Sequence, residues 1–206
     1  MSSKVKIYNL ALSALLLSRQ VTETESEKMS NEVRVLNQLW DSALESVLQQ
    51  LDLDSLVETI DLELIEEIPD NPHLVYAYKY PSRSIFLRRI KTSLIKDTSR
   101  TRIELKVGIY KNQKVIFTNE YQAQAECICR DVSLAFIGPS TELAIAYKLA
   151  YLACPLLVGK GAKTLREEIR QIFTMYMMDA KANDVNENFV YESPEEQSDF
   201  VAARIE

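Results

Sequence analysis

The sequence predicts an α+β protein in which helices from both chain ends form one bundle of about four helices, with a small antiparallel β unit inserted between them. Apolar residues recur at three- and four-residue intervals near both ends of the chain, the spacing of amphipathic helices. Between them the period changes to two residues, as in half-buried strands. We therefore expect a helical lobe from residues 1–55 and 139–187, a β lobe from 56–138, and a polar, acidic C-terminal tail from 188–206.

The segment from Ser140 to Leu157 is the centre of the predicted bundle. Its apolar residues cover both sides of a helix, a pattern typical of a helix that is buried all round. We expect Pro139 and the capping hydroxyls of Ser140 and Thr141 to mark its start. Pro155, followed by Gly159 and Gly161, is expected to end it. A lysine near the middle and a run shorter than the ~20 residues of a membrane span argue against a transmembrane helix.

Other helices are predicted on either side of the β unit. The first covers residues 4–17. The next begins at the capping-box pair Thr24 and Glu27 and runs to about Leu51, with Trp40 in its core-facing stripe. The last covers residues 163–186, where we expect the methionines at 175, 177 and 178 in ordinary core packing rather than on an adaptable binding surface.

Strands are predicted where apolar residues alternate with polar ones. One strand holds the alternation from Ile60 to Leu64, and a proline-containing loop follows it. In the next strand, Leu74 and the tyrosines at 76, 78 and 80 share one face, and Pro81 ends it. Segments 84–90, 102–109, 115–118 and 123–130 supply the remaining strands, with a Lys-Asn-Gln turn between the second and third of these.

The composition is that of a soluble globular protein, with 47% hydrophobic and 26% charged residues and a net charge of −6. This acidic balance disfavours general affinity for nucleic acid, which requires clustered positive charge. No cationic, apolar and cleavable N-terminal segment is recognisable, so we expect synthesis in a reducing cytoplasm. Cys127, Cys129 and Cys154 lack the spacing of zinc or redox motifs and are expected to be structural thiols.

No catalytic, cofactor or metal site is recognisable in the sequence. The one histidine, His73, follows a proline in a predicted loop and has no partner motif for nucleophilic catalysis. Glu66 and Glu67 form a carboxylate pair, but nothing nearby would hold one of them protonated, so we interpret them as a solvated acidic loop. Phosphate and dinucleotide signatures are absent. We expect a protein that is not an enzyme and uses no cofactor.

Opposite charges are separated along the chain. Residues 41–70 contain ten acidic residues and no lysine or arginine, whereas residues 79–114 contain eleven basic residues and two acidic ones. Two interpretations remain open. The segments form two solvated faces, or the basic β lobe docks on an acidic surface of a neighbouring copy or another protein, where complementary charge sets register and partner choice. A nucleic-acid interface is disfavoured, because the basic residues alternate along strands without a clear aromatic stacking pattern.

Several segments, in the same order, resemble the tail tubular protein A family, the head-to-tail adaptors of short-tailed (podovirus-type) bacteriophages. Residues 11–15 (ALSAL), 39–43 (LWDSA) and 47–48 (VL) are similar to the family's first two helices, and 76–81 (YAYKYP) to its tyrosine-rich strand. Residues 144–153 and 178–187 resemble its central and closing helices, so the likeness covers roughly residues 5–190. The chain departs from the family pattern at 18–21, 51–58 and 139–143, as a distant member would.

The resemblance implies a structural virion protein of the viral tail. It would be one subunit of an oligomeric ring, twelvefold in the family, that joins the portal protein to the tail nozzle (tubular protein B-like) and forms part of the DNA ejection channel. Tail fibres would attach nearby, genomic DNA would pass without specific binding, and no membrane would be involved. The ring would lie in the virion neck after assembly in the host cytoplasm. Two alternatives stay open: another phage neck or head-completion connector, and a small hydrolase.

Two sets of candidate residues follow from the charge pattern and the resemblance. An acidic channel wall repels phosphates and so does not trap the passing duplex, which makes Asp52, Asp54, Glu58 and Asp61 candidate channel-facing residues. Partner or subunit contacts are expected from the basic β lobe and from aromatic residues of the tail. This second set comprises Arg83, Arg88, Arg89, Lys91, Arg100, Arg102, Phe189, Tyr191 and Phe200.

Overall fold

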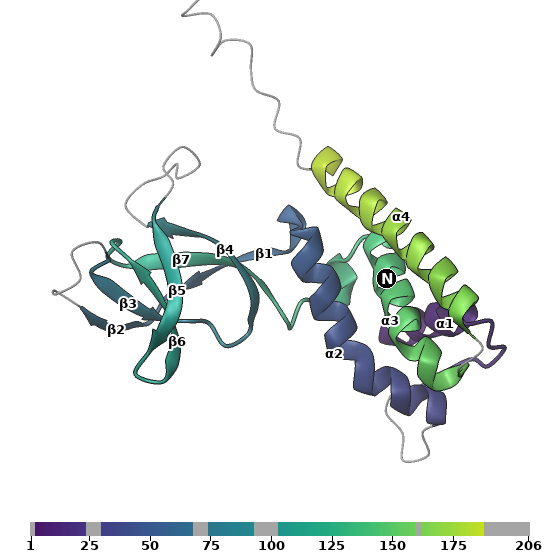
Figure 1. Ribbon diagram of the computed structural model, residues 1–206. Coiled ribbons are helices and arrows are strands. Elements are labelled where there is room, and N and C mark those ends of the chain that lie inside the picture. The colour runs from purple at the N-terminus through teal and green to yellow at the C-terminus, as the bar shows by residue number, and fades with distance from the viewer. Residues whose placement is uncertain (1–2, 24–29, 68–73, 93–102, 160–161, 188–206) are drawn as a thin grey trace, which may run out of the picture.

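The computed structural model describes residues 3–23, 30–67, 74–92, 103–159 and 162–187. Figure 1 shows two lobes side by side, with the helices of both chain ends in one lobe and the strands in the other. The chain passes into the β lobe after its second helix and returns before its third. The predicted α+β class, helices from both ends packed together around inserted antiparallel sheets, is therefore confirmed.

The first two helices pack their apolar stripes into the helical lobe. α1 covers Lys4–Ala14 and α2 covers Asn31–Leu51. The hydroxyl of Ser30 caps α2 by accepting the N–H of Val33 at 3.3 Å, which satisfies one of the free donors at the helix start. α2 therefore begins later than the predicted capping box, whose residues 24 and 27 lie outside the described ranges.

α3 (Pro139–Leu157) lies at the centre of the helical lobe, between α1 and α2. The predicted caps Ser140 and Thr141 were wrong, because the N-cap residue is Gly138 and Pro139 occupies the first helical turn. Proline suits that position, since its missing N–H would have no helical partner there. α3 ends at Leu157, as predicted, and Gly159 follows with a positive φ of 87°. Pro155 is inside this helix. It lies in the last turn on the exposed side, where water can satisfy the carbonyl that loses its N–H partner.

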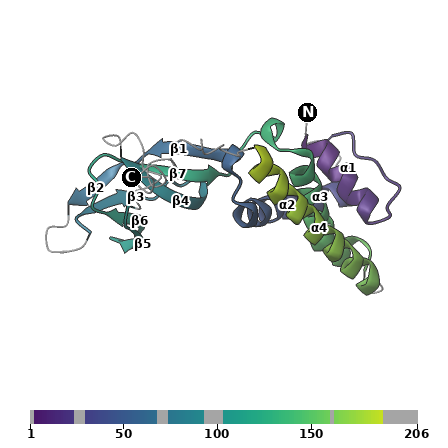
Figure 2. The ribbon, with the colours of Figure 1, turned by 90° about the horizontal axis from the view of Figure 1, so that it is seen from above.

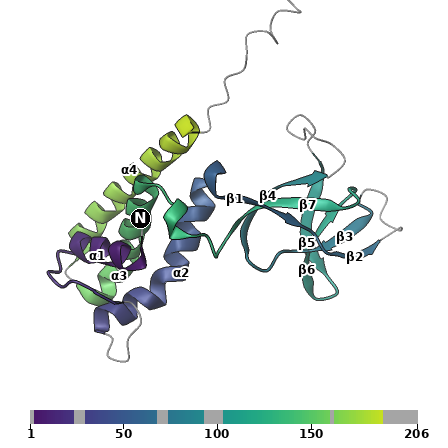
Figure 3. The ribbon, with the colours of Figure 1, turned by 180° about the vertical axis from the view of Figure 1, so that it is seen from behind.

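α4 (Lys163–Glu187) packs along the outside of α3, as Figures 1 and 3 show. Its inward stripe is buried at Ile169, Met177 and Ala180. Core packing was predicted for all of the methionines in this helix, and that prediction was wrong for Met175 and Met178, which are 50% and 66% exposed. The reason is that, within the described ranges, α4 packs almost entirely on α3, so positions opposite the inward stripe face away from the bundle.

The strands form two antiparallel sheets, and Figure 2 shows the first of them nearer the helices. The first sheet has the order β1 (Val57–Asp61), β7 (Ala123–Cys129), β4 (Ser84–Thr92). The second has the order β2 (Leu64–Glu67), β3 (Tyr76–Lys79), β6 (Gln113–Thr118), β5 (Leu105–Tyr110). Short 3₁₀ helices, η1 (Asp54–Leu56) and η2 (Leu134–Phe136), lie where the chain passes between the lobes.

The single strand predicted from Ile60 to Leu64 was wrong, because β1 and β2 divide it between the two sheets. Ile60 lies opposite Ala125 in the first sheet, whereas Leu64 lies opposite Tyr78 in the second. Alternation identifies the buried face of a strand but not its partner, so a change of sheet within an alternating run leaves no signal. Glu66 and Glu67 accordingly belong to β2 and not to the predicted loop.

Each lobe has its own apolar core. The helical core is built from α1 to α4 and includes Trp40, as predicted, and Ile128 of β7 joins it across the lobe boundary. The second core lies in the β lobe around Tyr78 and Ile116, with the other tyrosines of the predicted face, Tyr76 and Tyr80, packed against it. Because Ile128 is fully buried against the helices, the first sheet is fixed to the helical lobe and carries the second sheet outward.

Candidate subunit interface and lobe junction

Charged side chains join α2, α4 and β4 where the two lobes meet. Arg88 of β4 pairs with Asp52, at 3.6 Å, and with Asp54, both just beyond the end of α2. Asp184 near the end of α4 accepts the backbone N–H groups of Asp54 at 3.0 Å and Ser55 at 3.4 Å. A carboxylate that accepts the first N–H groups of a short helix caps it, so α4 holds the segment that leads into the β lobe.

A second group of ion pairs lies along the ends of the first sheet. Arg83 is 3.0 Å from Glu58 of β1 and 3.2 Å from Asp131 beyond β7. The hydrogen bond to Asp131 and the charges of both acids raise the pKa of Arg83. Arg130 reaches across the junction to Glu45 of α2 at 2.8 Å. These pairs orient the sheet on the helices, but each is exposed and adds little stability by itself.

Among the acids of the β lobe that the structure describes, Glu126 of β7 is the most enclosed, with a side chain 7% exposed. Arg89 and Lys91 of the neighbouring strand β4 both pair with it. Burial alone would raise the pKa of Glu126, but the hydrogen bonds and positive charges of Arg89 and Lys91 outweigh burial and lower it. Glu126 is therefore ionised at neutral pH, and both cations are directed toward it.

The described structure pairs the acidic and basic segments with each other inside one chain. Asp52 and Asp54 pair with Arg88, Glu58 pairs with Arg83, and Asp61 accepts a hydrogen bond from Gln124 at 2.7 Å. Their channel-facing and partner-facing roles stay predictions. The remaining candidates, Arg100, Arg102, Phe189, Tyr191 and Phe200, lie outside the described residues, as does His73.

The predicted acidic loop at Glu66 is instead a hydrogen-bonded site across the second sheet. Glu66 accepts a hydrogen bond from the Tyr110 hydroxyl at 3.0 Å and pairs with Lys111. The hydrogen bonds from Lys111 and Tyr110 lower the pKa of Glu66. This carboxylate is therefore ionised and bound, so it is not poised to act as a general acid.

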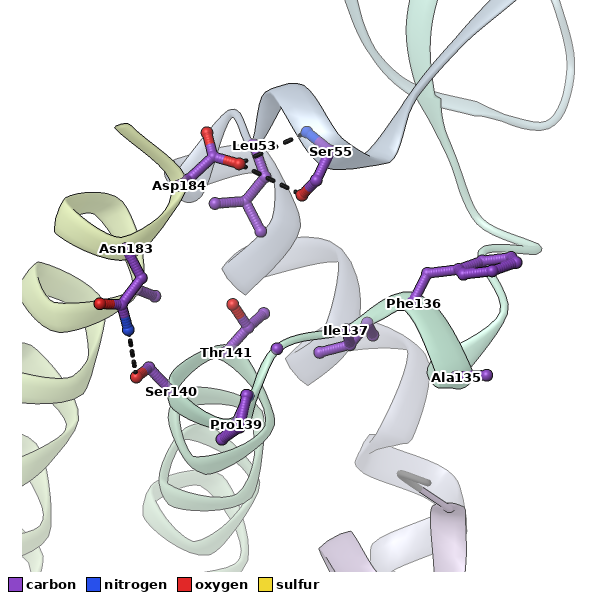
Figure 4. Close-up of a pocket in the computed structure, with 12 residues that line it drawn as sticks. Leu53, Ser55, Ala135, Phe136, Ile137, Pro139, Ser140, Thr141, Asn183 and Asp184 are labelled. Carbon is purple, nitrogen blue, oxygen red and sulfur yellow. Dashed lines mark hydrogen bonds between the residues drawn. The ribbon is translucent and has the colours of Figure 1, made fainter. Parts of the chain in front are cut away.

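A cavity of about 270 Å³ lies at the lobe junction, between η1, the start of α3 and the end of α4 (Figure 4). Figure 4 shows its polar groups bonded to one another: Asn183 donates to the Ser140 hydroxyl at 2.9 Å, and the Ser55 hydroxyl donates to Asp184 at 3.2 Å. Asp184 is the one ionisable residue among those that line it. The Asp184 carboxylate that faces the Ser55 hydroxyl also accepts the backbone N–H groups of residues 54 and 55, so the polar contacts of the cavity join the three segments.

The cysteines are free and buried within the described residues. The sulfurs of Cys127 and Cys129 lie 3.8 Å apart on one face of β7, as their spacing predicts. Burial, then the neighbouring Cys127, raises the pKa of Cys129 to about 12, so this thiol stays protonated and is a poor nucleophile. No group of three or more His, Cys, Asp or Glu side chains in the described ranges is arranged to hold a metal. None of the helices there is long and apolar enough to cross a membrane.

Apolar side chains are exposed on both lobes, a feature that the sequence analysis disfavoured on α4 and did not identify on β5. On α4, Met175, Met178 and Val185 are at least half exposed and lie three or seven residues apart, on one face of the helix. On β5, Val107 is 41% and Ile109 is 79% exposed. The three- and seven-residue spacing is visible in the sequence, but it predicts contact with some neighbour and does not say whether that neighbour belongs to the same chain.

Comparison with protein families and with curated proteins found no match for this chain.

Proposed function

We propose that this chain is a structural subunit of an oligomeric ring that joins the head of a short-tailed bacteriophage to its tail. The observation that carries the proposal is the exposed apolar surface on both lobes. Exposed apolar side chains that share one face of an outer helix, and others on a strand of the second sheet, support contact with a partner at these places. An adaptor between two larger assemblies needs contacts of this kind at more than one place.

The resemblance to the tail tubular protein A family supports the assignment to a phage adaptor. Its segments fall on α1, α2, β3, α3 and α4, so the elements that resemble the family form the bundle and one central strand of the second sheet. The charge balance is consistent with a DNA channel, because a net charge of −6 gives the duplex no general attraction to the wall. The partners that follow are the portal, a nozzle protein and further copies of this chain.

The decisive measurement is the solution mass of the full chain, alone and after mixing with the portal protein of the same source. The adaptor proposal expects a small species alone and a ring-sized complex with portal. A chain that stays monomeric or dimeric with portal contradicts it. In that case the same mass measurement with the purified nozzle and neck proteins of the same source would test the connector alternative. An activity screen would test the hydrolase alternative.

A further inference from the structure

β5 is an edge strand of the second sheet. It pairs with β6 and, within the described residues, with no strand on its other side. The strand contains no proline, and its register with β6 runs without a bulge from Leu105 to Tyr110. Proline and bulges are two devices by which proteins keep edge strands from pairing further. β5 therefore presents a regular backbone edge that can accept another strand.

The hairpin turn determines which backbone groups of β5 point outward. Lys111 and Asn112 both have positive φ, 48° and 62°, which is a two-residue turn of type I′. Tyr110 and Gln113 flank this turn as a hydrogen-bonded pair, and the pairs alternate along an antiparallel ladder. Leu105, Val107 and Ile109 consequently direct their N–H and C=O groups away from β6.

The side chains of the same residues form an apolar strip. Val107 lies opposite the buried Ile116, so its face is the one that covers the β-lobe core, yet it is 41% exposed. Ile109, two residues further, is 79% exposed. On the other face, Lys106 is exposed, and Gly108 has the ring of Phe117 3.0 Å from where its Cβ would lie. An added strand would meet apolar residues on one face and a lysine on the other.

Residues 188–193 of this chain, Asn-Phe-Val-Tyr-Glu-Ser, match that edge in one antiparallel register. Phe189 falls opposite Ile109 and Tyr191 opposite Val107, which are aromatic–β-branched pairs of the kind that stabilise sheets. On the other face, Val190 falls opposite the small Gly108 and Glu192 opposite Lys106. Pro194 follows immediately and would end the strand.

We propose that residues 188–193 of one copy add to β5 of a neighbouring copy as a fifth strand of the second sheet. The proposal rests on the proposed assembly into a ring, and it names one subunit contact of that ring. The donor must be another copy because one residue separates the end of α4 from Phe189, and a residue spans about 3.5 Å at most. α4 ends beside η1 at the lobe junction, and Figures 1, 2 and 3 all show β5 in the sheet far from that end.

A contact between the tail of one copy and the edge of the next is head-to-tail. The donor surface and the acceptor surface are different, so every copy can give one strand and receive one. Such a heterologous contact closes into a ring when the rotation from one copy to the next is a whole-number fraction of a full turn. The tail contact therefore supplies the type of symmetry that the proposed adaptor requires.

Disulfide trapping between two full-length variants tests the register. Val107→Cys and Tyr191→Cys chains are mixed at high concentration without portal and oxidised with copper phenanthroline. Facing residues of a hydrogen-bonded pair have Cα atoms about 5.5 Å apart, within disulfide range. The native cysteines are buried and will not compete. The control mixes Val107→Cys with Val190→Cys, which the register places one position away and on the opposite face.

The expected result is a heterodimer band at least tenfold stronger for the 107–191 mixture than for the 107–190 mixture. Equal bands, or no band in either mixture, overturn the proposal. The double variant Val107→Cys/Tyr191→Cys is expected to form a ladder of linked chains, and an internally linked monomer overturns the exchange between copies. The trapping experiment contains no portal, so its result is independent of the mass measurement with portal. Disulfide trapping in a chain that forms no complex with portal refutes the adaptor proposal and supports the strand addition. A ring that forms with portal in a chain that shows no trapping supports the adaptor proposal and refutes the strand addition.

A charge exchange checks the pairing on the other face. Lys106→Glu in the Val107→Cys chain is expected to slow trapping by roughly two- to fivefold, because a like-charged pair replaces an attractive one. Adding Glu192→Lys to the Tyr191→Cys chain is expected to restore the rate. Lys106 is exposed, so its replacement leaves the fold intact. Trapping that is unchanged by the single substitution, or not restored by the second, contradicts the proposed register.

Discussion

Replacing Glu126 by Gln is expected to destabilise the β lobe by about 1–2 kcal/mol at neutral pH. Hydrogen bonds to charged groups contribute about 1.5–3 kcal/mol, and removal of one member of a fully buried ion pair costs about 3–5 kcal/mol. The loss of stability expected for Glu126→Gln is smaller than for a fully buried pair because Arg89 and Lys91 are 45% and 33% exposed. Water therefore solvates both cations once the carboxylate is gone. For a chain of this size, the loss corresponds to a fall in Tm of about 2–8 °C.

The difference between wild type and Glu126→Gln should also depend on pH. The folded-state pKa of Glu126 is lowered, so its contribution is present above the unfolded pKa and is lost as the pH falls through the folded value. Urea unfolding at pH 7 and near pH 3 measures this, with Glu63→Gln as control. Glu63 has an exposed pair with Lys79, and its replacement should cost at most about 0.5 kcal/mol. An equal difference at both pH values, or a Gln variant as stable as wild type, refutes the reasoning.

Three further predictions concern the core, a thiol and the channel. Leu149→Ala, at a fully buried position of α3, should lower the free energy of unfolding by about 2–5 kcal/mol, whereas Leu156→Ala, 59% exposed on the same helix, should change it by less than about 0.5 kcal/mol in urea titrations. Cys129 should resist iodoacetamide at pH 8 in the native protein and react after unfolding, as mass spectrometry will show; rapid native alkylation would contradict its burial. Asp61→Asn should slow or stall DNA ejection from assembled particles if this acid faces the channel, and ejection at the wild-type rate rejects that role. Asp61 is chosen because neutralising Asp52 or Asp54 would also remove a partner of Arg88.

The amphipathic segments and the tyrosine-bearing strand were predictable because each depends on local periodicity. The positions of α3 and α4, the face shared by Tyr76 and Tyr78, and the fold class all follow from which residues recur at helical or strand spacing. Helix starts were less predictable. Several hydroxyl residues near a helix can serve as the cap, and local spacing does not say which one the chain uses, as Ser30 and Gly138 show.

The candidate interface could be predicted only in part. The sequence identifies two oppositely charged segments but not their partners, because an ion pair depends on distance in space. The fold turns β4 back toward the end of α2, and Arg88 then pairs with Asp52 and Asp54 of its own chain. The same limit applies to the methionines of α4, since a helical period marks a stripe without saying which stripe the next helix covers.

By itself the sequence determined what each segment can become: which faces are apolar, where helices and strands alternate, and that no recognisable catalytic motif is present. The tertiary structure decided which of these surfaces face each other. It divided one alternating run between two sheets and paired several acidic and basic side chains of the same chain with one another. Among the described residues, it left apolar side chains of α4 and β5 exposed. The physical reason is that burial and ion pairing arise from contacts between distant segments, which local spacing does not encode.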